Sequence, residues 1–431
     1  MLKVTVIGGG SSYTPELIKG FLDRRFSFPL DELCLMDINP ERLNIVGDFS
    51  KRIITSHGSP FKLTLSSDLN QAISGASYVI TQLRVGQMNA RRNDEYLGHR
   101  HGLIGQETTG IGGLAKALRT IPIILNITKV MQEYAPDGML VNFTNPAGLI
   151  TEALTRYAPE VPAVGVCNVA ITTKMMFLKE LAVRSGEVTT PERTNLLTLG
   201  LNHLSWHYGF EVDGVDIWEK LFPIYVDYLK KESDPEFDIE DILRLGMIPN
   251  YYLRYFYYTD RMLEKQAHWP PSRAEEVIAI EEELLHSYAE KERHTVPESL
   301  MKRGGAWYST TATQLINAHY NDLDEVHVAN VCHKGAVEEY PADWVMELPC
   351  RVDRKGVHPI PTKALPDECT QLIAQVKKYE QLTAQAAVAG DRDLVRRALL
   401  AHPLGPKKEK VNAVLDDLLE TNRKFLPAFF P

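Results

Sequence analysis

The sequence predicts an α/β protein in which a doubly wound parallel sheet comes first and a mixed α/β region follows. Over the first 170 residues, short apolar runs alternate with segments of helical spacing, the pattern of repeated βαβ units. After about residue 170, aromatic-rich segments, long helices and scattered short strands replace that alternation. Because 431 residues exceed one ordinary domain, we expect one domain over residues 1–170 and a second over residues 171–431.

Six apolar runs are the expected buried strands of the first domain, and they cover residues 2–8, 32–37, 61–65, 77–83, 138–143 and 161–167. Helical spacing lies between most of them, at 14–25, 41–56 and 114–134. In parallel sheets of this kind, ligands bind at the carboxyl ends of the strands. The residues that directly follow each run are therefore candidates for function.

The first of these positions carries a glycine-rich turn, "VIGGGSSYTPELI". Gly8 and Gly10 occupy the first two glycine positions of the dinucleotide fingerprint, while Tyr13 stands at the third. Asp37 ends the second run, where a carboxylate binds ribose hydroxyls and repels a 2′-phosphate. We therefore predict a Rossmann-like domain that binds NAD in preference to NADP. The alternative is a plain turn followed by a helix-entry cap at Asp37.

Composition argues against several classes of protein. The net charge is −9 and no basic segment stands out, so we expect no nucleic-acid partner. No stretch reaches the roughly 18 consecutive apolar residues of a membrane helix, and we expect no membrane partner. The five cysteines are dispersed and odd in number, which favours free thiols and a cytoplasmic location.

The second region contains an aromatic segment at 250–260, a long acidic helix at 272–294 and amphipathic stretches near 367–390 and 407–422. The amphipathic stretches are expected to pack on a neighbour, either within the chain or across an oligomer interface.

A thiol and an imidazole follow the later strands. Cys167 ends the sixth run, and His203 lies in "GLNHLSWHYG", which we expect to be a strand. Thiolate and imidazole suit a borderline divalent cation, and two protein ligands leave coordination positions open. The alternatives are a core cysteine and a His203–His207 pair that shares a helix face or a hydrogen bond.

Six motifs, in order, resemble glycoside hydrolase family 4: "GGGSSYTPEL", "GQETTGIGG", "NFTNPAG", "GVCN", "GLNHL" and "IPNYYLRYFY". The resemblance implies an NAD- and divalent-metal-dependent glycosidase, with Mn²⁺ as the ion and 6-phospho-sugars as substrates. It also implies a nucleotide-binding domain like that of lactate and malate dehydrogenases. A homodimer or homotetramer would be the assembly.

The same resemblance implies roles for individual residues. Cys167 and His203 match the metal ligands, and Tyr252 matches the catalytic base, with Tyr251 as the alternative one position earlier. The residues expected to bind the sugar and its phosphate are Arg91, Asn145, Asn168 and Arg273. The residues expected to bind the cofactor are Gly8, Gly10, Ser11, Asp37 and Asn142.

The family route begins with hydride transfer from C3 of the sugar to NAD. Tyr252 then removes the C2 proton, the aglycone is eliminated from C1, water adds, and the hydride returns. Asn168 after the cysteine resembles the 6-phospho-β-glucosidases, whereas an Asp there resembles the α-specific group. A carboxamide has no titrating proton, so the acid that protonates the leaving group stays unassigned, with a bound water as one alternative. Glu107 is a further candidate for contact with the sugar or nicotinamide.

Two rival functions share the glycine turn. A 2-hydroxy-acid dehydrogenase of the lactate/malate type would carry a G-x-H-G-D motif, and no "HGD" occurs in the chain. A non-catalytic NAD-binding sensor would need the turn and Asp37 but not Cys167, His203 and Tyr252 together.

Overall fold

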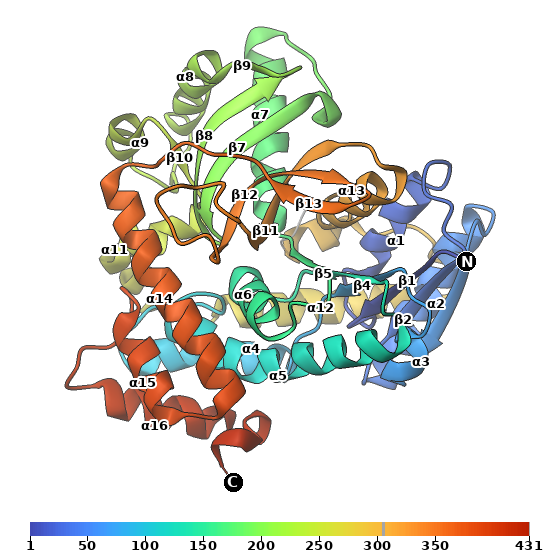
Figure 1. Ribbon diagram of the computed structural model, residues 1–431, viewed down its shortest axis with the longest axis horizontal. Coiled ribbons are helices and arrows are strands. Elements are labelled where there is room, and N and C mark those ends of the chain that lie inside the picture. Colours follow the sequence, from blue (N-terminus) through green and yellow to red (C-terminus); the bar gives the residue numbers. More distant parts are fainter. Residues whose placement is uncertain (304–306, 431) are drawn as a thin grey trace.

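The computed structural model describes residues 1–303 and 307–430. Within these residues one sheet of 13 strands runs through the protein in the order β10-β8-β7-β12-β11-β6-β5-β4-β1-β2-β3, with β13 paired to β12 and β9 paired to β8. Helices cover both faces of the sheet (Figure 1).

The parallel half of the sheet confirms all six predicted strands. They are β1 (Lys3–Ile7), β2 (Glu32–Met36), β3 (Lys62–Ser66), β4 (Tyr78–Thr81), β5 (Met139–Asn142) and β6 (Ala163–Gly165). The order β3-β2-β1-β4-β5-β6 with parallel pairing throughout is the doubly wound arrangement of dinucleotide-binding domains. The strand order reverses between β1 and β4, so the crevice for a ligand opens beyond their carboxyl ends.

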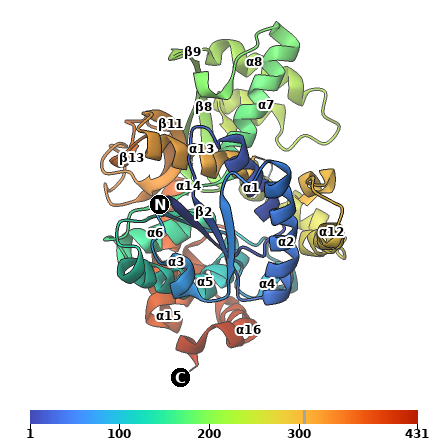
Figure 2. The ribbon, with the colours of Figure 1, turned by 90° about the vertical axis from the view of Figure 1, so that its right-hand side faces the viewer.

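The helices of this half lie in two layers. α1 (Thr14–Asp23) and α2 (Pro40–Ser56) cover one face, whereas α3 (Leu69–Ile73), α5 (Gly110–Tyr134) and α6 (Ala147–Tyr157) cover the other (Figure 2). α4 (Gln87–Arg100) connects β4 to α5. α2 begins where the Asn39 side chain accepts a hydrogen bond from the Arg42 N–H, which satisfies one of the free donors of the first turn. The predicted helices at 14–25, 41–56 and 114–134 are confirmed.

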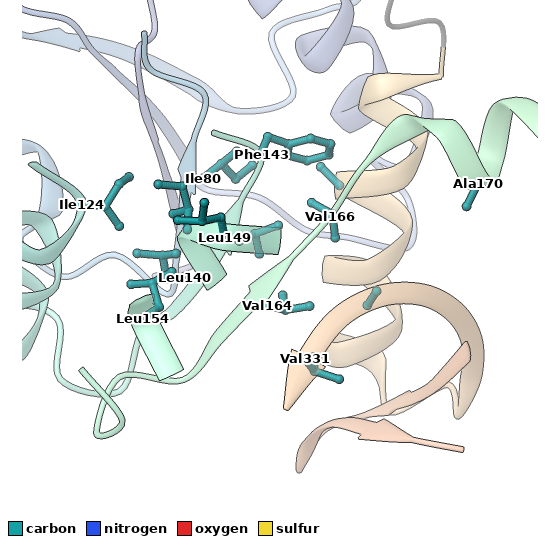
Figure 3. Packing of buried hydrophobic residues seen from close by; sticks show 14 of the residues in the cluster. Ile80, Ile124, Leu140, Phe143, Leu149, Leu154, Val164, Val166, Ala170 and Val331 are labelled. Atoms are coloured by element: carbon teal, nitrogen blue, oxygen red, sulfur yellow. The ribbon is translucent and has the colours of Figure 1, made fainter. Parts of the chain in front are cut away.

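Both faces of this half of the sheet are buried, and one layer of its core lies between β4–β6 and the helices α5 and α6. Figure 3 shows side chains of both layers in contact, among them Ile80, Leu140, Val164, Ile124, Leu149 and Leu154. By length and composition alone, α5 could cross a membrane, but 78% of its most apolar 18-residue stretch is buried inside the protein. Its apolar residues are therefore accounted for by the core.

The other half of the sheet is antiparallel and joins the parallel half where Asn330 of β11 pairs with Gly165 of β6. Its strands are β7 (Thr194–Leu201), β8 (Leu204–Val212), β9 (Val215–Asp216), β10 (Ile248–Pro249), β11 (Glu325–Cys332), β12 (Val345–Asp353) and β13 (Gly356–Pro359). Its helices are α7 (Asn168–Ser185), α8 (Trp218–Leu229), α9 (Ile239–Leu245), α10 (Arg254–Tyr257) and α11 (Thr259–Gln266).

Later segments return to the nucleotide-binding half. α12 (Arg273–Ala289) packs on α2 and α4, and α13 (Tyr308–Asn321) packs on α1. α14 (Asp367–Ala389), α15 (Arg392–Ala401) and α16 (Val411–Asn422) pack against α5, and α14 also against α6. The predicted amphipathic tail thus finds its neighbour within the chain. The sheet is continuous across residue 170, and the division of domains there stays a prediction.

Candidate functional site

The glycine turn after β1 passes between the ends of two neighbouring strands. The N–H groups of Gly8 and Gly9 both donate to the Met36 carbonyl, at 2.9 and 2.8 Å. Gly8 has φ +91°, and a Cβ there would lie 2.9 Å from backbone atoms of Gln82. Only glycine satisfies both the left-handed backbone and this close approach.

Asp37 lies against Gly10 of the glycine turn. The Gly10 N–H donates to Asp37 Oδ2 at 2.9 Å, and the Asn39 N–H donates to Asp37 Oδ1 at 2.9 Å. The half-buried carboxylate is thereby held against the turn. Ser11 follows in the same turn, where its hydroxyl accepts from the Tyr13 N–H at 3.3 Å.

A charged cluster that the sequence did not reveal braces this turn from α12. Glu281 accepts from Ser12 Oγ at 3.2 Å and from Arg303 Nε at 3.0 Å, and it lies 3.4 Å from a guanidinium nitrogen of Arg42. Arg42 Nε in turn donates to the Gly10 carbonyl at 3.2 Å. Burial raises the pKa of Glu281, but the guanidinium groups of Arg303 and Arg42 outweigh it and lower that pKa to about 2.

Cys167 and His203 come together at the carboxyl end of β6. Cys167 Sγ lies 3.5 Å from His203 Nε2. Cys167 is the N-cap residue of α7, and His203 lies in the two-residue turn between β7 and β8 with φ +65°. The expectation that a strand carries His203 is therefore wrong: a hairpin turn presents it, because the strand pairing closes at Leu201 and Leu204.

This pair fits a divalent cation by its donor chemistry. Burial raises the pKa of the Cys167 thiol to about 12 and lowers the pKa of His203 to about 3, so the free imidazole is neutral and able to offer a lone pair. No group of three or more His, Cys, Asp or Glu side chains that could hold a metal occurs in the described part of the chain. A cation here would take its remaining ligands from substrate or water.

His207 has no part in this pair. It lies in β8, fully buried, and neither ring nitrogen has a hydrogen-bond partner among the described residues. The alternative that His203 and His207 share a helix face or a hydrogen bond is wrong, because one residue lies in a turn and the other in a strand.

The Tyr252 ring covers the imidazole of His203. The two rings stack with centroids 3.8 Å apart and 9° between their planes. Tyr251 instead is 38% exposed and lies under the Arg254 guanidinium at 5.3 Å. Burial raises the pKa of Tyr252 well above its usual value. The two candidate tyrosines thus differ in place, and Tyr252 is the one that contacts a predicted metal ligand.

Arg91 belongs to a cluster of three cationic side chains around the Glu107 carboxylate. Arg91 lies 3.2 Å from Glu107 and donates to Glu95 at 2.9 Å, and Lys116 Nζ donates to Glu107 at 2.7 Å. Arg84 also pairs with Glu107. Burial raises the pKa of Glu107, but the three cations outweigh it and keep the carboxyl ionised. Burial lowers the pKa of Lys116 to about 7.

Sequence reasoning missed Arg84 and Lys116. Arg84 follows the fourth strand at its carboxyl end, which was a usable signal, whereas Lys116 lies inside α5 and nothing in its local sequence marks it.

The remaining predicted residues differ in what their side chains already bind. Asn145 is half-buried at the start of α6, with its Oδ1 accepting from the Ala147 N–H at 3.3 Å, and Asn168 is half-buried at the first position of α7. Asn142 is fully buried, and its amide bonds to Thr81 and to the Thr144 backbone. The assignment of Asn142 to the cofactor site stays a prediction.

Arg273 begins α12 beside the Arg91 cluster, because the N–H of the next residue, Ala274, donates to Glu95 at 2.8 Å. The Arg273 side chain is 45% exposed, and it donates to Glu276 and to the carbonyls of Lys302 and Arg303. Its contacts anchor the backbone before residue 304.

Comparison with known proteins places these residues in a family context. Residues 3–183 match "Family 4 glycosyl hydrolase", and residues 198–405 match the "Family 4 glycosyl hydrolase C-terminal domain". A Bacillus subtilis protein named "Probable 6-phospho-beta-glucosidase" is 40% identical over 100% of this chain and 98% of its own length. A phospho-alpha-glucosidase of Clostridium acetobutylicum is 26% identical over 98% of both chains.

Comparison with solved structures also finds 6-phospho-glucosidases. The 6-phospho-beta glucosidase of Thermotoga maritima, solved with manganese, NAD+ and glucose-6-phosphate, superimposes with a TM-score of 0.91 at 38% identity and 99% coverage of both chains. Malate dehydrogenase from Plasmodium falciparum superimposes with a TM-score of 0.55 at 14% identity, covering 92% of this chain and 100% of its own. The malate dehydrogenase likeness concerns the fold alone and confirms the predicted Rossmann-like class.

Proposed function

This chain belongs to family 4 of the glycosyl hydrolases, and we propose that it hydrolyses 6-phospho-β-glucosides with NAD and a divalent metal ion, Mn²⁺, as cofactors. The observation that carries the proposal is the Cys167–His203 pair, 3.5 Å apart, with the Tyr252 ring stacked on the imidazole. The Thermotoga maritima relative, solved with manganese, NAD+ and glucose-6-phosphate, supports the same set of ligands.

The turn after β1 is the proposed cofactor site. Without side chains, Gly8 and Gly10 pack closely on Gln82 and Asp37, and the backbone of this turn, with Ser11 before α1, would contact the pyrophosphate. Asp37, fixed by the Gly10 N–H, would accept from the ribose hydroxyls and repel a 2′-phosphate. NAD, rather than NADP, is therefore the proposed cofactor.

The chemistry divides between the cofactors and the chain. When bound, NAD supplies reversible hydride transfer at C3 and the metal ion supplies Lewis-acid stabilisation of charge on the sugar oxygens. Cys167 and His203 would hold the ion, and Tyr252, stacked on His203, would take the C2 proton. Arg91 interacts electrostatically with Tyr252, whereas burial and the neighbouring Tyr251 raise the pKa of Tyr252.

The Arg91 cluster is the proposed site of the 6-phosphate. Three cationic side chains, Arg84, Arg91 and Lys116, share two carboxylates, Glu107 and Glu95. One positive charge is in excess when Lys116, whose pKa is lowered to about 7, is protonated, and a bound phosphate would favour that form. Such an excess suits a phosphate, and guanidinium groups offer paired donors to it.

Asn168 and Asn145 would orient the sugar between the phosphate and the metal ligands. Arg273, which also donates to the carbonyls of Lys302 and Arg303, is proposed as a further contact of the phosphate, since its neighbour Ala274 donates to Glu95 of the cluster.

The proposed preference for the β anomer rests on Asn168 and on the higher sequence identity of the chain to β-specific than to α-specific relatives. Asn168 carries no titrating proton, in contrast to the Asp expected of the α-specific group. The chain is 36–40% identical to three 6-phospho-β-glucosidase relatives and 26% identical to the phospho-alpha-glucosidase of Clostridium acetobutylicum. We also propose a homodimer or homotetramer that works in the cytoplasm without nucleic-acid or membrane partners.

Hydrolysis of p-nitrophenyl-β-glucoside 6-phosphate tests the proposal, with and without added NAD and Mn²⁺. We expect nitrophenol release only when both are present, and only from the β-linked phosphorylated compound. Equal cleavage of the unphosphorylated glucoside would contradict the phosphate site. Cleavage of the α-linked analogue instead would overturn the argument from Asn168.

The two rival functions have weaker support. The malate dehydrogenase likeness, at 14% identity, extends to the fold alone. A non-catalytic sensor would have no use for the Cys167–His203 pair, and the same assay excludes it if nitrophenol is released.

A further inference from the structure

His203 can serve the proposed metal site only in one of its two neutral forms. A neutral imidazole carries one N–H and one lone pair, and the hydrogen bond made by one nitrogen decides which form is present. His203 Nε2 faces Cys167 Sγ at 3.5 Å, and His203 Nδ1 faces Thr108 Oγ1 at 2.9 Å. A metal ligand at Nε2 requires the proton on Nδ1, so Thr108 would have to accept rather than donate.

Thr108 has a single hydroxyl proton and two neighbours that could receive it. One is His203 Nδ1, and the other is Gln106 Oε1 at 2.8 Å. The same terminal atom of the Gln106 amide group also accepts from the backbone N–H groups of Thr108, at 2.5 Å, and of Thr109, at 3.0 Å. Because a backbone N–H only donates, this atom must be the amide oxygen and not the nitrogen.

That assignment decides which group donates in each of the two hydrogen bonds of the Thr108 hydroxyl. An amide oxygen has no proton to give, so the Thr108 hydroxyl must donate to Gln106. The Thr108 oxygen is then left to accept from His203 Nδ1–H. We propose that Gln106 and Thr108 are positioning residues that fix His203 in its Nδ1–H form and so aim the Nε2 lone pair at the metal position beside Cys167.

The loop of residues 105–110, which contains Gln106 and Thr108, is held by hydrogen bonds at both ends. The Gly105 N–H donates to Gln266 Oε1 at 2.6 Å, and the Gly110 N–H donates to His402 Nε2 at 3.3 Å. Glu107, between Gln106 and Thr108, is fixed by its three cationic partners.

The first turn of α5 packs directly on this segment. A Cβ at Gly112 would lie 2.2 Å from the Gln106 carbonyl oxygen, and one at Gly113 would lie 2.7 Å from backbone atoms of Thr108. Gly112 and Gly113 of "GQETTGIGG" are thereby explained, since any side chain at these two positions would push the loop away from His203.

The ring itself has little freedom to change partners. His203 is 6% exposed as a residue, and the stacked Tyr252 ring covers one face of its imidazole. Outer hydrogen bonds of this kind commonly change metal affinity by about 10–100-fold when removed. The consequence for metal binding rests on the proposed function, whereas the protonated nitrogen can be measured without metal or substrate.

The direct test is long-range ¹H–¹⁵N NMR of metal-free full-length protein labelled with [¹⁵N]histidine. The His203 signal is identified by its loss in His203→Gln. We expect the Nδ1–H pattern in the parent and in Thr108→Ser, which keeps the hydroxyl. Thr108→Val, which removes it at nearly constant volume, should lose that pattern. Thr109→Val, one residue further along the same loop, is the matched control and should keep it.

Mn²⁺ affinity, measured by the EPR signal of the free ion, provides the second readout. We expect Thr108→Val to bind Mn²⁺ at least about 10-fold more weakly than the parent, with unchanged affinity for NAD as evidence of correct folding. Thr108→Ser should restore most of the affinity.

The Nε2–H form in the parent would overturn the proposal, as would Thr108→Val with parental NMR signals and Mn²⁺ affinity. A protein that shows the Nδ1–H form yet cleaves no glycoside would count against the proposed function and leave the hydrogen-bond assignment standing.

Discussion

The Glu281 cluster makes a sharp prediction about stability, because one buried carboxylate of α12 pairs with two half-buried guanidinium groups beside the glycine turn. Glu281→Gln removes the charge while keeping the shape of the side chain. Arg303 and Arg42 then lose their shared anion, and Ser12 keeps only a neutral acceptor. Cations that lose their partner while partly removed from water are costly, so we expect a large loss of stability.

The magnitude follows from the pKa of Glu281, which is lowered from 4.5 to about 2 although burial opposes the shift. At about 1.4 kcal/mol per pKa unit, the ionised carboxylate contributes about 3 kcal/mol to folding at neutral pH. Because the folded pKa is the lower one, this contribution is fully present above about pH 5 and declines as the pH falls toward the folded value. At pH 3.5 it should be smaller by about 1 kcal/mol.

Urea unfolding of the parent and of Glu281→Gln at pH 6.5 and pH 3.5 measures both quantities. Glu283→Gln is the matched control, since Glu283 is an exposed carboxylate on the same helix. We expect the free energy of unfolding of Glu281→Gln to be about 3 kcal/mol below that of the parent at pH 6.5, and this difference to be smaller at pH 3.5. The control variant should differ from the parent by less than about 0.5 kcal/mol. A deficit no larger than that of the control, or one that does not change with pH, would refute the electrostatic reasoning.

Three further predictions concern the site. Cys167→Ser and His203→Gln should each lose Mn²⁺ binding and turnover while keeping parental NAD affinity by fluorescence titration; parental turnover in either would disprove the metal assignment. Tyr252→Phe should lower kcat by about 10²-fold or more and stop solvent deuterium entering the product at C2, whereas Tyr251→Phe should change kcat only a few-fold; the reverse result would make Tyr251 the base. Gly8→Ala should weaken NAD binding at least about 10-fold, because its Cβ would lie 2.9 Å from backbone at φ +91°, and unchanged affinity would contradict the assigned cofactor turn.

The features that the sequence predicted well are those with a local signature. Buried parallel strands are continuous apolar runs, so β1 through β6 could be located from composition alone. Gly8, Gly10 and Asp37 follow two of these strands, and the parallel pairing of β1 with β2 brings them together. Cys167 could be placed at a carboxyl end for the same reason.

Other parts of the site depend on contacts between distant segments. Thr108 and His203 are 95 residues apart, and Ser12 and Glu281 are 269 residues apart. Nothing in the acidic segment at 272–294 distinguishes Glu281, which is buried, from its exposed neighbours Glu282 and Glu283. The helix period that selects the buried face is visible only once the neighbouring helices α2 and α4 are placed.

The position of His203 shows how the antiparallel strands complete a site begun by the parallel ones. The β7–β8 turn is held from behind by Glu347 of β12, which accepts from Asn202 Nδ2 at 2.9 Å and from Ser205 Oγ at 2.8 Å on either side of His203. β12 pairs with β11, and β11 pairs with β6, the strand that leads to Cys167. A continuous line of strand pairing therefore sets the distance between thiol and imidazole. Because a paired sheet resists sliding, the two donors are held in place before any cation arrives, and a flexible loop at either position would not provide this.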